Sequence, residues 1–382
     1  MSETVESLDT RKRFLYPAGL IAIVAMGYFP ITRTMLGQGD FPYHIGFAVA
    51  LAQGELAVPH ILLHALTAEG ILLGLTPTAA ITVVILGFQV LAAWGVSWLA
   101  QRSGASAGVA MSLGVSIVFV APILPLEIAA DADVYPAGYF LPNALNNPTV
   151  TAAKAFVPFL IELGVMLSGA AAVTWSWSRI AAIVVFAGLA KPHYVSCLFP
   201  VVVAACAWRW WGGHRVSWGP VLSFTIAGVA VLLWTAIGTT ALVGGGTAII
   251  APLAVLRSWG GQDVAVDAVS IAARACSDGA FPITVLVLWP DARRFPALVL
   301  AWAAYGVGLA QGLLLAETGY RMLDGNFMWS PQLATFGVMA ASAAWLGRSS
   351  ARWNWRVMIA WSVLAIHVAY GVWWISARVA AR

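Results

Sequence analysis

The fold class follows from residues 77–101, which read PTAAITVVILGFQVLAAWGVSWLAQ and contain no charged side chain. A helix needs about 20 apolar residues to cross the hydrocarbon core of a bilayer. Similar stretches recur along almost the whole chain and leave no interval for a large soluble domain. The sequence therefore predicts an all-α fold, a single polytopic transmembrane domain over residues 1–382 with about 10 or 11 spans. We expect these spans at 14–35, 77–101, 105–126, 151–175, 179–190, 193–210, 217–243, 280–290, 295–316, 330–347 and 355–377, with broken or tilted elements near Pro192 and Pro282.

The composition excludes an ordinary soluble protein. Hydrophobic residues make up 61% of the chain and charged residues only 9%, whereas soluble domains carry about 25% charged residues. The net charge of +4 does not indicate nucleic-acid binding, because in a membrane protein the positions of Lys and Arg matter more than their sum. Cys197, Cys206 and Cys276 lack the spacing of a zinc site or a disulfide framework. Residues 11–13 are basic and precede an apolar run without a cleavage site, so we expect an uncleaved first span.

The basic residues predict the orientation, since Lys and Arg concentrate in cytoplasmic loops. With a cytoplasmic N-terminus, twelve of the 20 basic residues fall in short inner segments, provided that residues 44–75 form two helices in the outer interface, broken near 54–59. Residues 247–278 are likewise expected to form amphipathic surface helices that cover a cavity. We expect a multi-pass protein of the plasma (inner) membrane whose active face is extracytoplasmic, because its long polar segments lie outside. The twelve residues are Arg11, Lys12, Arg13, Arg102, Arg179, Arg209, Arg215, Arg293, Arg294, Arg348, Arg352 and Arg356.

Asp40 is the first candidate for chemistry. It lies in Gly37-Gln38-Gly39-Asp40-Phe41-Pro42-Tyr43-His44, directly after the first span. Partial desolvation at a membrane surface raises the pKa of a carboxylate toward the range of a general base. The alternative interpretation is structural, with Asp40 as the N-cap of a helix that begins near Pro42.

A second group of polar residues precedes the span at 151–175. Asp131 and Asp133 are spaced so that they can share a divalent cation or the hydroxyls of a sugar, with Asn147 as a hydrogen-bonding partner. The structural alternative is that Asn147 and Thr149 cap the next span, with Pro148 in its first turn. Both interpretations can hold together.

Two further groups are predicted to bind an anion. Lys191 and His193 lie between two short spans, where a cation normally marks a pathway, a partner or an anionic ligand such as a lipid phosphate. The alternatives for Lys191 are an ion pair with Glu162 or an extended position that reaches the interface. Residues 317–329 contain more polar groups than a connecting loop needs, and arginine offers a fork for phosphate oxygens. The candidates in this loop are Glu317, Arg321, Asp324, Asn326 and Trp329, the last either stacked on a sugar or anchored in the interface.

The order of these segments resembles the GT-C superfamily of integral membrane glycosyltransferases. The likeness rests on an acid just after the first span and on three motifs, NALNNPT at 143–149, AGLAKPHY at 187–194 and ETGYRMLDGNFMW at 317–329, which resemble segments of uncharacterised bacterial members. The resemblance implies inverting transfer of a sugar from a polyprenyl-phosphate-linked donor to a glycan, lipid or protein acceptor of the cell envelope. It implies Asp40 as general base and Lys191 and Arg321 as partners of the leaving phosphate.

Metal dependence stays open at this point. Many members of the superfamily have two neighbouring acids in the first loop, whereas Asp40 has none beside it, although His44 follows one helical turn later. If a divalent cation, Mg²⁺ or Mn²⁺, takes part, its candidate ligands are Asp40, Asp131 and Asp133. The residues expected to bind substrate are His44, Asp131, Asp133, Asn147, Lys191, His193, Glu317, Arg321, Asp324, Asn326 and Trp329.

Two other classes of function compete with this interpretation. A transporter or flippase of a lipid-linked or amphiphilic solute would use the same polar residues without a general base, and a scaffold would use the outer loops as partner surfaces. Transporters carry ionisable residues near the bilayer midplane on several spans. Glu162 is almost alone in such a position in the sequence, which favours chemistry at one face.

Overall fold

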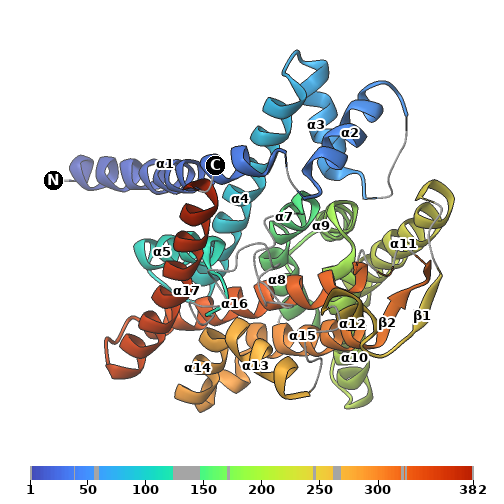
Figure 1. Ribbon diagram of the computed structural model, residues 1–382. Coiled ribbons are helices and arrows are strands. Elements are labelled where there is room, and N and C mark those ends of the chain that lie inside the picture. The colour runs from blue at the N-terminus through green and yellow to red at the C-terminus, as the bar shows by residue number, and fades with distance from the viewer. Residues whose placement is uncertain are drawn as a thin grey trace.

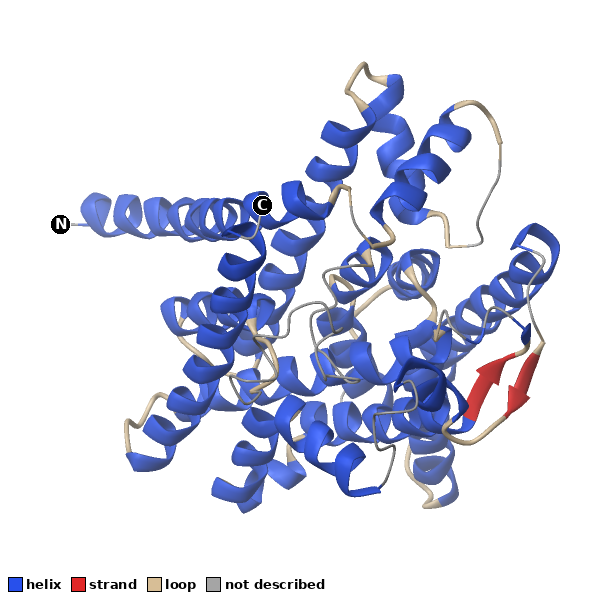
Figure 2. Ribbon diagram, viewed as in Figure 1, coloured by secondary structure: helices blue, strands red, loops and turns tan. Residues whose placement is uncertain are grey.

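The computed structural model describes residues 2–37, 39–55, 60–123, 147–169, 173–243, 247–260, 268–319, 322 and 325–380. Within these ranges the chain is almost entirely helical (Figures 1 and 2). The first half contains α1 (Ser2–Met35), α2 (Phe41–Ala52), α3 (Leu62–Leu72), α4 (Pro77–Arg102), α5 (Ala107–Phe119), α7 (Pro148–Lys154), α8 (Val157–Ser168) and α9 (Trp177–Ala190). The second half contains α10 (His193–Trp211), α11 (Trp218–Val243), α12 (Ala254–Gly260), α13 (Ala268–Asp278), α14 (Ala280–Leu288), α15 (Pro296–Leu314), α16 (Trp329–Ser349) and α17 (Trp355–Ala380).

Seven helices of the described part are long and apolar enough to cross a membrane, or eight if the bent pair α13–α14 forms one span. The chain is thus a multi-pass helical membrane protein, with fewer full-length spans than the ten or eleven expected. Three expected spans are short or broken: α5 has 13 residues, α9 has 14, and α14 meets α13 at an angle of 76°. The seven are Tyr16–Met35, Pro77–Arg102, Pro148–Ser168, His193–Trp211, Trp218–Gly238, Pro296–Leu314 and Trp355–Ala377.

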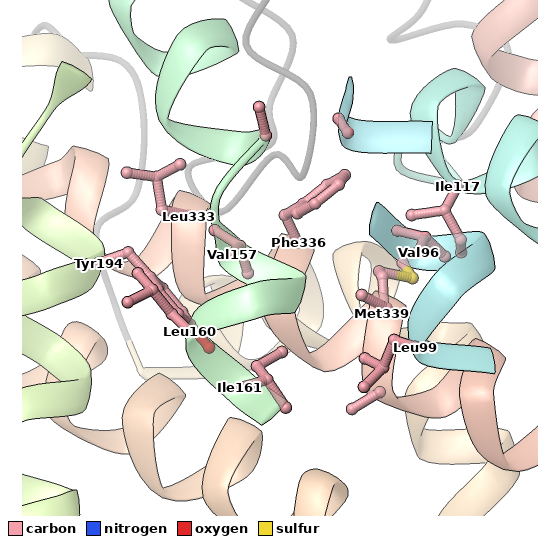
Figure 3. Packing of buried hydrophobic residues seen from close by; sticks show 14 of the residues in the cluster. Val96, Leu99, Ile117, Val157, Leu160, Ile161, Tyr194, Leu333, Phe336 and Met339 are labelled. Carbon is pink, nitrogen blue, oxygen red and sulfur yellow. The ribbon is translucent and has the colours of Figure 1, made fainter. Parts of the chain in front are cut away.

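Helix α16 is the centre of the domain. It was expected as a span, but it is less apolar than the seven and lies among other helices, with Leu333, Phe336 and Met339 fully buried. Figure 3 shows these side chains packed against residues of α4, α5, α8 and α10. A Cβ atom at Gly308 of α15 would lie 3.0 Å from the carbonyl oxygen of Ser330, so a small residue permits the close approach of α15 and α16. Because protein surrounds α16 on most sides, its polar residues do not face lipid.

The α2–α3 hairpin covers one end of the bundle. Its helices have 12 and 11 residues, too few to cross a bilayer. They pack against each other and against α4, and α3 also contacts α7 and α9 (Figure 1). The expectation of two helices rather than a span over 44–75 is therefore confirmed. Gly54 has a φ of 90°, which favours glycine where α2 ends and the chain turns.

The segment 247–278 is only partly helical. Besides α12 and α13 it contains β1 (Ala248–Ile250), which pairs antiparallel with β2 (Leu315–Glu317) in the register Ala248↔Glu317. This small sheet was not expected from the sequence. It forms because the chain segments that follow α11 and α15 run side by side and satisfy each other's backbone groups. Helix α13 does line a cavity of about 110 Å³, together with α14, α15 and α16.

Candidate active site

The predicted polar residues come together where several helices begin. Asp40 precedes α2, Asn147 precedes α7, Lys191 lies between α9 and α10, and Trp329 is the first residue of α16. Hydrogen bonds and a ring contact join these four residues into one cluster, described below. The segments of sequence that carry them are up to 289 positions apart (329 − 40), so only the fold makes them neighbours.

Asp40 directs its carboxylate away from its own helix. It occupies the N-cap position of α2, with φ −83° and ψ −9°, but its side chain caps no backbone N–H of that helix. Instead Oδ2 accepts a hydrogen bond of 2.8 Å from Nδ2 of Asn147. The capping interpretation of Asp40 therefore holds for its position and not for its carboxylate, and the residue is partly buried.

Asn147 serves two neighbours at once. Its Oδ1 accepts hydrogen bonds from the backbone N–H groups of Thr149 and Val150, at 3.1 and 3.2 Å, and so caps α7. It also accepts a bond of 2.6 Å from the Thr149 hydroxyl. Pro148 stands in the first turn, where its missing N–H has no cost. The predicted capping role of Asn147 is confirmed and that of Thr149 is wrong, because Thr149 lies within α7 and its N–H is one of the capped groups. The amide N–H₂ of Asn147 donates to Asp40.

Lys191 is a buried cation at the other end of this chain of contacts. The residue is 4% exposed, and its Nζ donates to the Thr149 hydroxyl at 3.1 Å. The ammonium also lies 4.8 Å from the centroid of the Trp329 ring, within the range of a cation–π interaction. Trp329 is 5% exposed, so it is not an interfacial anchor.

The expected alternative pairing of Lys191 with Glu162 is wrong. Oε1 of Glu162 lies 3.1 Å from a guanidinium nitrogen of Arg102, the last residue of α4. Glu162 is thus tied to the helix end that carries a predicted cytoplasmic arginine, and it is not an isolated charge at mid-depth. The ammonium of Lys191 is held by hydroxyl and ring instead.

Histidines line the side of the cluster formed by the α2–α3 hairpin. Nδ1 of His44 lies 2.8 Å from Nε2 of His64, and Nδ1 of His64 lies 3.2 Å from the carbonyl oxygen of His60. Burial, and then the neighbouring His64 and Lys191, hold the pKa of His44 well below its usual 6.5. Burial also lowers the pKa of His64 to about 4. Both rings are therefore neutral at physiological pH.

The loop before α16 adds a second layer of contacts. His193 forms a hydrogen bond with the backbone of Asn326. Nδ2 of Asn326 in turn donates to Oε2 of Glu317 at 2.5 Å. Asn326 and Glu317 are thus joined within the segment that precedes α16 and Trp329, and His193 lies near Lys191 as well. Asp131, Asp133, Arg321 and Asp324 lie outside the described residues.

Three residues were not predicted as parts of the site, although Thr149 was named as a helix cap. The three are His64 of α3 and Thr149 and Lys154 of α7. All three are buried, with exposures of 1%, 0% and 0%. Nζ of Lys154 lies 5.7 Å from the centroid of the Phe336 ring. A lysine inside an apolar stretch was a visible signal, since such residues usually mark function. The roles of His64 and Thr149 had no local signal, because both depend on partners distant in sequence.

No metal site is found among the described residues: no group of three or more His, Cys, Asp or Glu side chains could hold an ion there. Asp131 and Asp133 lie outside that part of the chain, so a metal involving them is untested. Comparisons of the sequence and the structure with protein-family models, curated proteins and solved structures found no match.

The cluster has two chemically different sides. The carboxylate of Asp40 and the ring nitrogens of neutral histidines are hydrogen-bond acceptors, which suit hydroxyl groups. The ammonium of Lys191 is a buried cation, which suits an anion. A ligand that fits both sides carries hydroxyls and a negative charge.

Proposed function

We propose that the protein transfers a sugar from a polyprenyl-phosphate-linked donor to a hydroxyl of a cell-envelope glycan, lipid or protein, on the extracytoplasmic side and with inversion. The observation that carries this proposal is the chain of hydrogen bonds from Asp40 through Asn147 and Thr149 to Lys191. It keeps a base and a cation at a fixed separation within one site. The resemblance of the sequence motifs to GT-C glycosyltransferases supports the same reaction class.

In this reaction Asp40 accepts the proton of the acceptor hydroxyl as its oxygen attacks the anomeric carbon. The new carbon–oxygen bond forms as the bond between the anomeric carbon and the phosphate oxygen breaks, and the electron pair of that bond leaves with the lipid phosphate. Lys191 stabilises the negative charge that develops on the phosphate, which a buried cation does far better than one in water. Attack from the face opposite the leaving group inverts the anomeric configuration.

A second candidate function is translocation of a lipid-linked or amphiphilic solute. It is favoured by Lys154, which is fully buried where the span Pro148–Ser168 is interrupted between α7 and α8. Buried charges beside discontinuous helices are features of transporters. This function would use Lys191 and Lys154 and would not need Asp40 as a base.

The deciding experiment compares purified wild type and Asp40→Asn in lipid, each with a panel of radiolabelled polyprenyl-phosphate sugars and cell-envelope acceptors. Loss of a general base lowers the rate by about 100- to 10,000-fold. We expect such a loss with unchanged thermal stability. Asp291→Asn is the matched control, because Asp291 is exposed in the 3-10 turn Pro290–Arg294, which adjoins α14 and α15. An active Asp40→Asn variant would remove Asp40 from the mechanism, and lipid translocation without transfer would favour the second candidate.

A further inference from the structure

Three of the six histidines of the chain form one connected row beside Lys191. The rings of His44 and His64 are stacked with centroids 5.1 Å apart, and the ring of Phe47 meets both of them edge-on. His60 lies beyond His64, with ring centroids 6.3 Å apart. The row joins α2, the start of α3 and the connection between them.

The hydrogen bonds of this row determine which nitrogen of each ring carries the proton. A carbonyl oxygen only accepts, so Nδ1 of His64 must donate to the carbonyl of His60. In the neutral ring Nε2 of His64 is then the acceptor, and Nδ1 of His44 must donate to it. Nε2 of His44 is consequently left with a lone pair and no proton. These two hydrogen bonds fix the tautomer and orientation of His44, as an acidic partner does for a catalytic histidine.

Nε2 of His44 is available to a ligand. This atom makes no hydrogen bond to any residue in the described part of the chain. It also keeps some exposed surface, because it is absent from the fully buried polar atoms of that part that have no partner. His44 keeps 7% of its surface exposed, against 1% for His64. The depressed pKa of His44 keeps this lone pair unprotonated at and below neutral pH.

His44 stands next to Asp40. Its backbone N–H bonds to the carbonyl of Asp40, one helical turn earlier, and residues at this spacing are neighbours on a helix surface. The carboxylate of Asp40 and the unprotonated imidazole nitrogen of His44 are both hydrogen-bond acceptors, and they belong to residues one helical turn apart. Two such acceptors suit a ligand group that donates hydrogen bonds.

We propose that Nε2 of His44 accepts a hydrogen bond from a hydroxyl of the acceptor substrate beside Asp40, with His64 as the residue that positions it. Besides its own three histidines, the charged and titratable groups near this row are Asp40, Lys191 and His193. The nature of the ligand rests on the proposed function. The state of His44, by which we mean its tautomer and its lack of a proton on Nε2, does not. The two parts can therefore be tested separately.

The state of His44 is tested by modification of wild type in lipid with diethyl pyrocarbonate, a reagent that acylates unprotonated imidazole nitrogens, followed by peptide mass spectrometry at several pH values. An imidazole with a pKa of about 6.5 is only about one-quarter neutral at pH 6. We expect His44 to react at nearly its full neutral-pH rate at pH 6, and His64 to resist. His214, exposed between α10 and α11, reports that the reagent is active. A His44 that is unreactive, or that follows an ordinary histidine titration, would overturn the inference.

His64→Gln tests the positioning role. Its amide keeps an acceptor and a donor but removes a titratable neighbour that lowers the pKa of His44. The pH at which His44 loses reactivity should therefore rise in this variant. An unchanged profile would show that His64 has no such role.

The ligand contact is tested with two variants in the transfer assay. His44→Asn keeps a donor in place of Nδ1 but has no atom in place of Nε2, whereas His44→Gln keeps an acceptor there. We expect kcat/KM for the acceptor to fall about tenfold or more in His44→Asn, to fall less in His44→Gln, and donor binding to be unchanged in both. Full activity of His44→Asn would remove the ligand contact while leaving the proposed function intact. If wild type itself shows no transfer, the proposed function fails and the modification experiment still decides the state of His44.

Discussion

The site around Lys191 and the ion pair of Arg102 with Glu162 handle charge in opposite ways. Lys191 is 4% exposed and its ammonium contacts a hydroxyl and an indole ring. The side chain of Arg102 is 56% exposed, and that of Glu162 is 12% exposed, with the two charges 3.1 Å apart. The contact of Lys191 with Thr149 and the ion pair of Arg102 with Glu162 each join segments distant in sequence.

The difference separates a binding function from a structural one. An ion pair open to solvent contributes little to stability, about 0–1 kcal/mol, and its charges are already compensated. A buried ammonium is screened less by water than an exposed one, so it attracts an anion more strongly. The location and surroundings of a charge, rather than its presence in an apolar sequence, therefore indicate function.

Replacing Lys191 should produce the largest effect. Lys191→Met keeps the length of the side chain and removes the cation, so binding of a polyprenyl-phosphate sugar in lipid should weaken about a hundredfold. The measurement is direct donor binding with a radiolabelled lipid. Glu162→Gln is the matched control and should bind the donor as wild type does. Equal affinities for all three proteins would mean that Lys191 does not meet the phosphate.

Changing Asn147 separates helix capping from support of Asp40. Aspartate caps helices as well as asparagine, so Asn147→Asp should keep the cap of α7, and any loss of thermal stability should come from the lost contact with Asp40. It replaces the donor to Asp40 with a second carboxylate, and a hydrogen bond to a charged group contributes about 1.5–3 kcal/mol. Turnover should therefore fall about tenfold or more. Wild-type turnover together with intact stability would contradict a role for this contact in orienting Asp40.

Thr149 tests the link between the two sides of the site. Thr149→Val removes the hydroxyl that accepts from Lys191 and donates to Asn147, and should cost about 1–3 kcal/mol of stability. Thermal unfolding in detergent measures this loss. Thr149→Ser keeps the hydroxyl and should lose clearly less, so equal losses in both variants would point to packing of the methyl group instead.

The smallest effect is expected at the solvent-exposed pair. Arg102→Ala should lower the free energy of unfolding by no more than about 1 kcal/mol, and the loss should shrink as salt is added. Unfolding at low and high ionic strength measures both. A large loss that salt does not change would show that this pair is as sheltered as Lys191 and would remove the contrast between the two regions.

The sequence anticipated much of the candidate site but not its internal order. Asp40, His44, Asn147, Lys191 and Trp329 were all candidates, since polar residues beside apolar spans are visible in the sequence. Their pairing was not, because each bond joins segments far apart in the chain. The predicted pairing of Lys191 with Glu162 was wrong for this reason. The sequence does not show which residues lie next to each end of α8 in the fold.

The helix count illustrates the same limit. Apolar length alone predicted crossing segments at 105–126, 179–190 and 280–290, yet these form short or sharply bent helices. The break between α13 and α14 lies at Gly279, and α9 ends at Ala190, two residues before Pro192. Hydropathy records how apolar a segment is and not where its helix begins, ends or bends.

The sequence by itself determined that this chain is a helical multi-pass membrane protein, because its scarcity of charge and its recurrent apolar stretches leave no other way to satisfy the backbone. Only the tertiary structure decided that α16 is enclosed by other helices, that Lys191 is separated from Glu162, and that the histidines form an ordered row. The physical reason is that hydropathy acts locally along the chain, whereas hydrogen bonds and buried charges depend on which helix ends the packing brings together.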